Sequence, residues 1–162
     1  MAIEEHISGR DIMVFHGIAL TFGGEEGVIS EGLADVALYD AWFKSRGDPV
    51  KYAALAYYNL ILNHPFVNGN KRTATLTAYI ILHINKYELV AEDVELVNLA
   101  LKVARNEIDR ENLVEWFKNH IKTRNTAIKL PKDVEERRKV LEKIAWEIVE
   151  KHRKVFEELA KY

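Results

Sequence analysis

The feature that most constrains the fold is a segment from about Asn70 to Asn85 that is apolar on nearly every side of a helix. A helix of this kind has no face suited to solvent, so it has to lie in the middle of its domain. Threonines fill most of its other positions, and its apolar side chains are Ala74, Leu76, Ala78, Tyr79, Ile80, Ile81, Leu82 and Ile84. Other elements of the chain must therefore surround it.

Those other elements are predicted to be helices as well. Apolar residues recur at three- and four-residue spacing, and no segment alternates at period two apart from a possible short strand at 87–90. Ser8, Asp48 followed by Pro49, and Asp109 are typical helix starts. The remaining helices are expected over about 9–22, 30–47, 50–63, 92–105 and 110–122, which makes the fold class all-α.

The C-terminal part of the chain has a different character. We place a compact domain at residues 1–125 and a C-terminal helical extension at residues 126–162. From Pro131 the chain is highly charged, with one apolar stripe at helical spacing: Val134, Leu141, Ile144, Ile148, Val149, Val155, Phe156 and Leu159. A long amphipathic helix needs something to cover its stripe. Three alternatives remain for what the stripe packs against: the chain's own domain, a second copy in a homodimer, or the functional groove.

The composition excludes several classes of protein. The chain has no cysteine, which rules out disulfides, thiolate metal sites and a cysteine nucleophile. The net charge of −2 gives no overall attraction to nucleic acid or anionic lipid, so neither is expected as a direct partner. No apolar run approaches the roughly eighteen residues that span a bilayer, and the N-terminus does not resemble a signal peptide. The expected location is the cytoplasm.

The residues predicted to carry chemistry lie just before the central helix and are His64, Pro65, Phe66, Val67, Asn68, Gly69, Asn70, Lys71 and Arg72. The unpaired N–H groups at the start of a helix, together with the helix dipole, make an anion site that phosphates commonly fill. Lys71 and Arg72 add positive charge where the dipole disfavours it, so a bound anion is the natural reason for their position. Gly69 allows close backbone approach, and Asn70 can hold the loop or donate to a phosphate oxygen. His64 can take a proton from a hydroxyl group, so the segment indicates phosphoryl-group chemistry.

These nine residues resemble the signature of the Fic/Doc superfamily, H-P-F-x-(D/E)-G-N-(G/K)-R. The Asn-Lys-Arg-Thr ending is more similar to the Doc (death-on-curing) branch than to the Fic branch, which usually has Asn-Gly-Arg and a second arginine three places later. Thr75 stands where that second arginine would fall. The glycine turn at Gly23–Gly27 is also Doc-like, and the resemblance spans about 7–121. It implies a compact helical domain of the Fic/Doc type.

The resemblance also implies transfer of part of a nucleoside triphosphate to a protein hydroxyl. Fic relatives typically transfer AMP, whereas the Doc branch is associated with transfer of the terminal phosphate, with elongation factor Tu as the target type. Carried over by position, His64 is the general base and Phe66 anchors the loop, while Lys71 and Arg72 hold phosphate oxygens beside an anion hole of backbone amides around 69–71 with Asn70. We therefore expect a toxin-type protein kinase that uses ATP, with AMP transfer as the alternative.

Asn68 departs from the family pattern, which has at this position an acid that coordinates magnesium. An amide oxygen can ligate Mg²⁺ but lacks the negative charge, so the affinity for the metal should fall. Three outcomes are open: weak metal-dependent activity, activity with magnesium held mainly by the nucleotide phosphates, or a degenerate site in a binding or regulatory module.

Two further expectations concern regulation and packing. The inhibitory motif of many Fic proteins, (S/T)-x-x-x-E-(G/N), has no full match, because Glu26 follows the correctly spaced Thr21 and Glu25. Restraint is therefore expected from a separate Phd-type antitoxin, as in Doc systems, or from the C-terminal helix acting in cis. His16 is expected to pack in the core or the groove wall, and three tryptophans are expected in the core: Trp42, Trp116 and Trp146.

Overall fold

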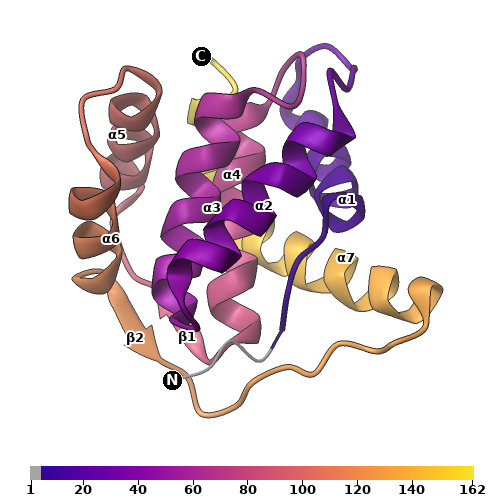
Figure 1. Cartoon of the computed structure of the whole chain (residues 1–162). Coiled ribbons are helices and arrows are strands. Elements are labelled where there is room, and N and C mark those ends of the chain that lie inside the picture. The colour runs from indigo at the N-terminus through magenta and orange to yellow at the C-terminus, as the bar shows by residue number, and fades with distance from the viewer. Residues whose placement is uncertain (1–4) are drawn as a thin grey trace.

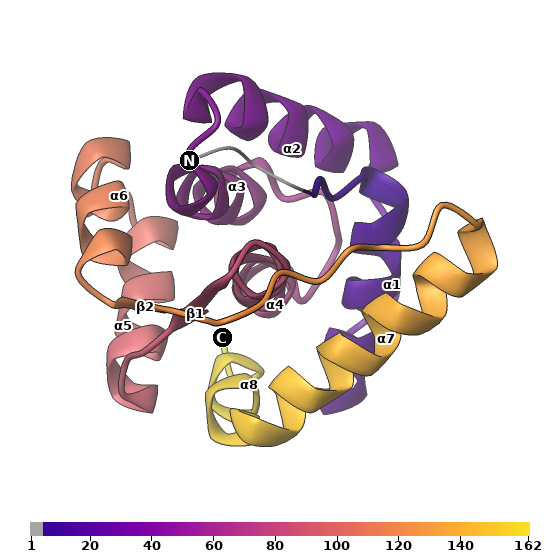
Figure 2. The same cartoon turned by 90° about the horizontal axis from the view of Figure 1, so that it is seen from below.

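The computed structural model describes residues 5–162 and shows a group of helices arranged around one central helix (Figure 1). That helix is α4 (Asn70–Ile84), and 12 of its 15 residues are buried. Figure 2, seen from below, shows α4 in the middle, with helices from the N-terminal, middle and C-terminal parts of the chain around it. The prediction of an all-α fold around a buried central helix is confirmed.

Three helices precede α4 in the chain. α1 (Gly9–Ala19) is followed by a short 3-10 helix, η1 (Leu20–Phe22), and packs against α4. α3 (Pro49–Asn63) packs between α4 and α2 (Glu31–Ser45). The predicted start signals are in place, because the Ser8 hydroxyl accepts a hydrogen bond from Asp11 N–H and the Asp48 carboxylate accepts one from Val50 N–H. These caps fix where α1 and α3 begin.

The middle of the chain contains two helices and two short strands. α5 (Asp93–Ala104) and α6 (Arg110–Lys118) pack against α3. β1 (Tyr87–Leu89) confirms the predicted strand and pairs antiparallel with β2 (Ile121–Thr123). The helix expected over 110–122 therefore ends four residues early, at Lys118. Local periodicity could not predict β2, because its partner strand β1 lies far away in the sequence.

The C-terminal stripe is covered by the chain's own domain. It forms two helices, α7 (Val134–Lys151) and α8 (Arg153–Leu159), and not the single helix expected, because the chain leaves helical geometry at His152. α7 packs against α1 and α4, and α8 packs against α5 and α4. Every stripe residue except Val134 is buried. A homodimer formed through this stripe is therefore the wrong alternative.

Two of the three tryptophans are not in the core. Trp42 on α2 is 39% exposed and Trp146 on α7 is 40% exposed, so the prediction for these two residues was wrong. Trp116 is partly buried, and its ring stacks on that of His120 with the centroids 3.9 Å apart. No helix within residues 5–162 is long and apolar enough to cross a membrane.

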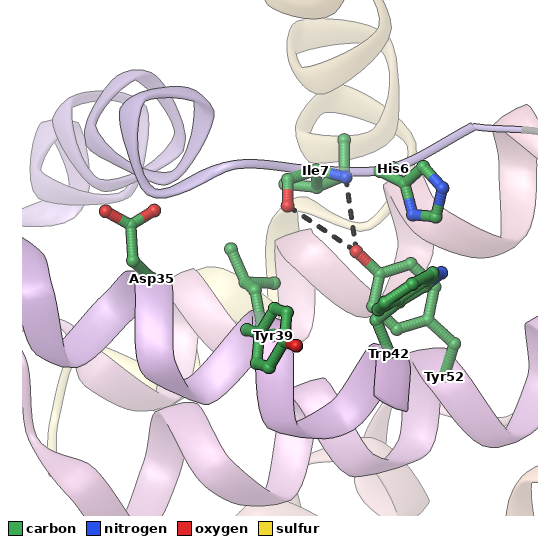
Figure 3. A pocket seen from close by; sticks show the side chains of 7 residues that line it. His6, Ile7, Asp35, Tyr39, Trp42 and Tyr52 are labelled. Carbon is green, nitrogen blue, oxygen red and sulfur yellow. Dashed lines mark hydrogen bonds between the residues drawn. The ribbon is translucent and has the colours of Figure 1, made fainter. Parts of the chain in front are cut away.

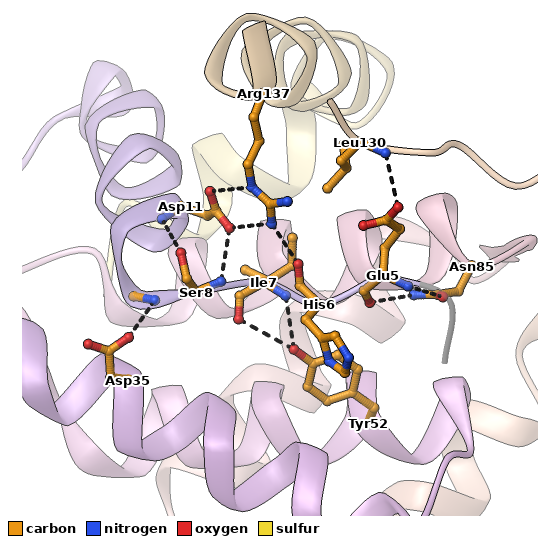
Figure 4. Close-up of polar contacts among 11 residues, drawn as sticks. Glu5, His6, Ile7, Ser8, Asp11, Asp35, Tyr52, Asn85, Leu130 and Arg137 are labelled. Atoms are coloured by element: carbon orange, nitrogen blue, oxygen red, sulfur yellow. Dashed lines mark hydrogen bonds and ion pairs between the residues drawn. The ribbon is translucent and has the colours of Figure 1, made fainter. Parts of the chain in front are cut away.

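Polar contacts tie the N-terminal arm, residues 5–8, and the start of α1 to the C-terminal part of the chain (Figure 4). The Arg137 guanidinium donates from Nη2 and Nε to the two carboxylate oxygens of Asp11, at 2.9 and 3.3 Å. The Leu130 N–H donates to the Glu5 carboxylate at 3.1 Å. The arm is also held from α3, where the Tyr52 hydroxyl lies 3.2 Å from Ile7 N. Residues from opposite ends of the sequence are thereby joined.

Candidate active site

The segment 64–69 forms a loop that joins α3 to α4 and enters α4 at Gly69. Gly69 is the N-cap of α4 with φ of +78°, a conformation that favours glycine. No side chain caps this end, so the N–H groups of the first turn have no side-chain acceptor. A hollow of about 180 Å³ beside the helix start is lined by residues that include Gly69, Asn70 and Lys71. The anion site predicted from the sequence thus has an uncapped helix end and a space next to it.

The side chain of Asn70 braces the loop. Its Nδ2 donates to the carbonyl oxygen of Phe66 at 2.9 Å, and its Oδ1 accepts from the Phe66 N–H at 3.2 Å. Nδ2 also lies 3.5 Å from Nδ1 of His64. The sequence left open whether Asn70 holds the loop or donates to a phosphate, and the contacts here favour the first role.

His16 of α1 packs against the inner side of the loop 64–69. Phe66 is buried, as expected, and its ring stacks on that of His16 with the centroids 3.7 Å apart and the planes 5° apart. Nε2 of His16 donates to the carbonyl oxygen of Asn68 at 2.8 Å. Burial lowers the pKa of His16, and the charge of Arg72 adds to that effect while the carbonyl contact opposes it. His16 is therefore a neutral histidine packed in the core against the loop, which confirms its predicted packing role.

The segment after the glycine turn pairs with the loop along its outer edge. The N–H groups of Ile29 and Ser30 donate to the carbonyl oxygen of Pro65 at 2.8 and 3.1 Å, and the Val67 N–H donates to Gly27 at 3.1 Å. A Cβ on Gly27 would lie 2.7 Å from Cγ2 of Val67, so this close approach needs glycine. An extended segment thus borders the site.

Arg72 acts as a clamp inside the protein. Its side chain is buried, and the whole residue is only 2% exposed. Nη1 donates to the carbonyl oxygens of Ala19 and Gly23 at 2.8 and 2.7 Å, and Nη2 donates to Oδ1 of Asn68 at 3.0 Å. Burial lowers the pKa of Arg72, but an arginine still carries its charge at neutral pH. Arg72 therefore has a structural role, and it also contributes positive charge to the hollow that it lines. Its predicted contact with phosphate oxygens stays a prediction.

Lys71 is the cation that remains available to a ligand. Its side chain is half-buried and lines the hollow. Burial is the main cause that lowers its pKa, and the neighbouring charge of Arg72 acts in the same direction. In the part of the chain that the structure describes, no acidic side chain acts on Lys71. An anion entering the hollow would supply the missing negative charge.

His64 stands at the rim of the hollow and is exposed. It is the residue that ends α3, and its backbone is in the left-handed region with φ of +49°. A side chain with a Cβ is disfavoured there by about 1–2 kcal/mol, and glycine is the usual occupant. A histidine in such a position fits the prediction that its imidazole takes part in the chemistry, and that role stays a prediction.

Asn68 does not offer a site for a metal ion. Its Oδ1 accepts from Arg72 and its backbone oxygen accepts from His16, so both oxygens are engaged and the nearest charge is positive. Among residues 5–162 no group of three or more histidine, aspartate or glutamate side chains could hold a metal. These residues do not fit a magnesium ion coordinated by the protein.

The far wall of the hollow comes from the C-terminus, which lies at the same end of the molecule as the loop (Figure 1). Leu159 of α8 and Tyr162 line it, the first buried and the second 62% exposed. The apolar stripe indicated a helix that could lie over the groove, but nothing in its pattern singled out these two residues. They are site residues that the sequence reasoning missed.

Fold and site together define a mainly helical protein with a hollow and an exposed imidazole at the start of its central helix. The sequence profile of the Fic/DOC family matches residues 10–82. A protein named Toxin Doc from Mycolicibacterium smegmatis is 33% identical over 124 residues, which cover 68% of this chain and 89% of that protein. The chain belongs to the Fic/Doc family.

A second group of relatives matches a shorter segment. Proteins named protein adenylyltransferase Fic from Drosophila melanogaster and Drosophila sechellia are each 45% identical to the chain over 58 residues. These residues make up 31% of this chain and only 12% of each Drosophila protein. Both names in the family, Doc and Fic, are therefore represented among its relatives.

Proposed function

We propose that this protein is a nucleotide-dependent transferase that modifies other proteins, and that it acts as a Doc-like kinase. In this proposal ATP is the substrate that gives up its terminal phosphate, and a serine or threonine hydroxyl of a protein target receives it. The observation that carries the proposal is the uncapped start of α4, where Lys71 lines a hollow whose rim holds the exposed His64. A triphosphate fits the positive end of a helix, and a hydroxyl nucleophile needs a base.

The chemical step uses these groups in a simple order. The target hydroxyl oxygen bonds to the γ-phosphorus, and its proton passes to a ring nitrogen of His64. The bond between the γ-phosphorus and the β–γ bridging oxygen breaks, and ADP leaves with that electron pair. The amides at the start of α4 and the ammonium of Lys71 stabilise the negative charge on the phosphoryl oxygens. Any magnesium is proposed to arrive with the nucleotide, since the chain's own residues do not fit it.

AMP transfer is the second candidate, and the Drosophila relatives named adenylyltransferases favour it. Here the hydroxyl attacks the α-phosphorus and pyrophosphate leaves. Lys71 favours the kinase, because a bulky cation stands where the Fic pattern has a glycine that leaves room for further phosphate. Incubation of the protein and a cell lysate with ATP labelled at the α or the γ position separates the two reactions. We expect protein-bound label only from the γ position; label only from the α position would show that the kinase proposal is wrong.

A binding module without turnover is the third candidate, and Asn68 is the residue that favours it. An aspartate at this position would sit beside the Arg72 guanidinium, which now lies 3.0 Å from the Asn68 oxygen. We expect Asn68→Asp to raise the affinity for magnesium, but only when nucleotide phosphates share the ion. Calorimetric titration of Mg²⁺ into both variants, with and without ATP, measures this. Equal Mg²⁺ affinities of the wild type and the variant in the presence of ATP would show that the residue at position 68 does not bind the metal.

The partners of this site are also proposals. The relative named Toxin Doc favours a toxin–antitoxin context, with a translation factor such as elongation factor Tu as target and a small Phd-type protein as antitoxin. A reading frame for a Phd-like protein beside the gene, and co-purification of its product with this chain, would support the context. Purification of the chain alone from its native cells would argue for a free-standing enzyme.

The C-terminal segment is proposed to restrict the site in cis. Removing it from Thr126 onward would be a poor test, since α7 and α8 bury Leu141, Val149 and Phe156 in the core. Tyr162→Ala is a milder change, because this exposed side chain only lines the hollow. We expect the variant to keep its melting temperature and to bind ATP several-fold more tightly, as measured by calorimetry. Unchanged or weaker binding would mean that Tyr162 does not obstruct the nucleotide.

A further inference from the structure

An apolar stripe lies on the solvent side of α2. Val36, Tyr39 and Phe43 follow three- and four-residue spacing and are 60%, 65% and 66% exposed. The rings of Tyr39 and Phe43 stack with centroids 6.5 Å apart, and Trp42 lies 6.0 Å from Tyr39. The opposite face of α2 is apolar too, and it is already buried against the domain: Ala34, Ala37, Leu38 and Ala41. The outer stripe therefore has no function in the fold of one copy.

A hollow of about 390 Å³ lies beside the stripe, between α2 and the N-terminal arm (Figure 3). Leu38, Tyr39 and Trp42 line it from α2, and Ile7 lines it from the arm. Its polar lining residues are His6, Asp35 and Tyr52. The Tyr52 hydroxyl is already bonded to the backbone of Ile7, and the Asp35 carboxylate accepts from the Gly9 N–H at 2.7 Å. The hollow is thus a mainly apolar recess next to projecting aromatic rings. Projection and recess on the same surface are what a self-complementary interface requires.

Charge is unevenly divided along α2. Glu31 and Asp35 lie in its first half, and Lys44 and Arg46 lie at its end. The end of α2 borders a groove of about 470 Å³ with α3 and α6, and that groove is lined by five cations and one acid among its described residues: Lys44, Arg46, Lys51, Arg110, Lys118 and Glu111.

Local ion pairs neutralise only part of this positive charge. Lys44 pairs with Asp40 at 2.9 Å and Lys118 pairs with Asp48 at 3.3 Å. Arg46 and Lys51 make no ion pair within residues 5–162. At the other end of α2, Arg10 lines a hollow together with Glu31 and Asp35, so the acidic end is weaker than the basic one. The end of α2 still offers cations that an acidic surface would pair.

We propose that α2 is the contact face of a symmetric homodimer, in which two copies of the helix pack antiparallel about a two-fold axis near Tyr39. Such an axis sets the stripe of one copy on the stripe of the other and brings the aromatic rings of each beside the recess of the other. It also brings Glu31 of each copy towards Arg46 of the other, so the charge pairing occurs twice. A parallel pair of α2 helices would instead set Glu31 beside Glu31 and Arg46 beside Arg46.

The size of the stripe sets the expected affinity. An aromatic side chain buries roughly 150–250 Å² when it is fully covered, so the exposed parts of three rings supply on the order of 300 Å² per copy. A stable interface takes about 800 Å² per partner, so the arm and the cationic groove must contribute the remainder. We expect a dissociation constant of about a micromolar, typical of a moderate and reversible dimer.

Sedimentation velocity of the full chain over a range of concentrations tests the proposal. Val36→Glu places a charge in the stripe of both copies, and we expect it to raise the dimer dissociation constant by about a hundredfold. Val94→Glu on α5 is the matched control, because Val94 is 59% exposed and also lies on a helix. We expect the control to sediment as the wild type does, and thermal melts show that both variants fold. A wild type that stays monomeric overturns the proposal, as does an equal effect of the two variants.

A charge exchange tests the antiparallel pairing itself. Glu31→Lys and Arg46→Glu each create two repulsive contacts in their own homodimer, so each variant alone should dimerise more weakly. Mixed together, the two variants regain both attractive pairs and should form a heterodimer about as stable as the wild-type dimer. Absence of a heterodimer in the mixture contradicts the proposed orientation. Neither experiment involves nucleotide, so the outcome is independent of the proposed transferase activity.

Discussion

Position 64 carries a histidine in a backbone conformation that glycine adopts more easily. The neighbouring positions are occupied by residues with defined structural tasks: Asn70 braces the loop and Arg72 clamps it to the end of α1. The imidazole of His64 is exposed and has no comparable task, since its only polar contact within residues 5–162 is with Nδ2 of Asn70, 3.5 Å from its Nδ1. The positive φ of this residue costs stability, and the predicted role of His64 as the base would explain why a histidine stands there.

This reasoning predicts that stability and activity separate at position 64. We expect His64→Gly to raise the free energy of unfolding by up to about 1 kcal/mol, because glycine relieves the positive φ. The same change should abolish phosphate transfer, since the base is lost. Urea denaturation and the labelled-ATP assay measure the two effects. A destabilised variant, or one that still transfers label, would contradict the assignment of His64.

One buried and two half-buried histidines make the stability of the protein depend on pH. Burial is the main cause that lowers the pKa of His16, His83 and His152 below the ordinary value of 6.5. The unfolded chain takes up protons at these residues first, so stability is complete above about pH 6.5 and falls as the pH drops towards the folded pKa values. We expect His16→Gln to flatten the slope between pH 7 and 5, as followed by denaturation at each pH. An unchanged slope would mean that His16 is not buried in its neutral form.

At the scale of elements, the central helix decides the architecture. The apolar positions of α4 predicted its burial, and the caps Ser8, Asp48 and Asp109 predicted three helix starts correctly. Signals of this kind are local, because a cap or a periodic stripe involves neighbours within one or two turns. The sequence could not show that β2 replaces the end of the last predicted helix in the domain, since its strand partner lies more than thirty residues away.

For the candidate site too, the local sequence indicated one part and the tertiary fold set the rest. The structure brings His64, Gly69 and Lys71 together around one hollow, and their predicted roles in catalysis and phosphate binding stay predictions. Arg72 instead turns inward to the carbonyl groups of Ala19 and Gly23, which the sequence separates from it by about fifty residues. Leu159 and Tyr162 complete the wall from the other end of the chain. Contacts set by the tertiary fold were thus the part that the motif could not supply.

At the scale of the whole molecule, the N-terminal and C-terminal parts are joined into one unit. α7 covers α1 and α4, and the pair between Asp11 and Arg137 lies across that contact. Asp11 is nearly buried, whereas Arg137 remains about a quarter exposed. The hydrogen bond to Asp11 is the main cause that raises the pKa of Arg137. The C-terminal helices therefore belong to the structural unit that presents the site.

Loss of the ion pair between Asp11 and Arg137 should lower the stability of the whole molecule. We expect Arg137→Ala to lower the free energy of unfolding by about 2 kcal/mol, because it leaves a buried carboxylate without its partner. Arg138→Ala is the matched control, since Arg138 is exposed and, within residues 5–162, pairs only with Glu135 and Glu142 of its own helix. Denaturation of both variants should show a large change for the first and little for the second. Equal effects would mean that the pair does not hold α7 in place.

The most direct test of the account is to map where the nucleotide binds. Backbone amide NMR signals of the protein, followed during a titration with ATP, report on each residue separately. We predict the largest shifts at Gly69, Asn70 and Lys71, weaker binding in Lys71→Met, and preserved binding in His64→Ala, which removes the base but not the phosphate site. Shifts confined to another part of the molecule, or none at these three amides, would contradict the central claim.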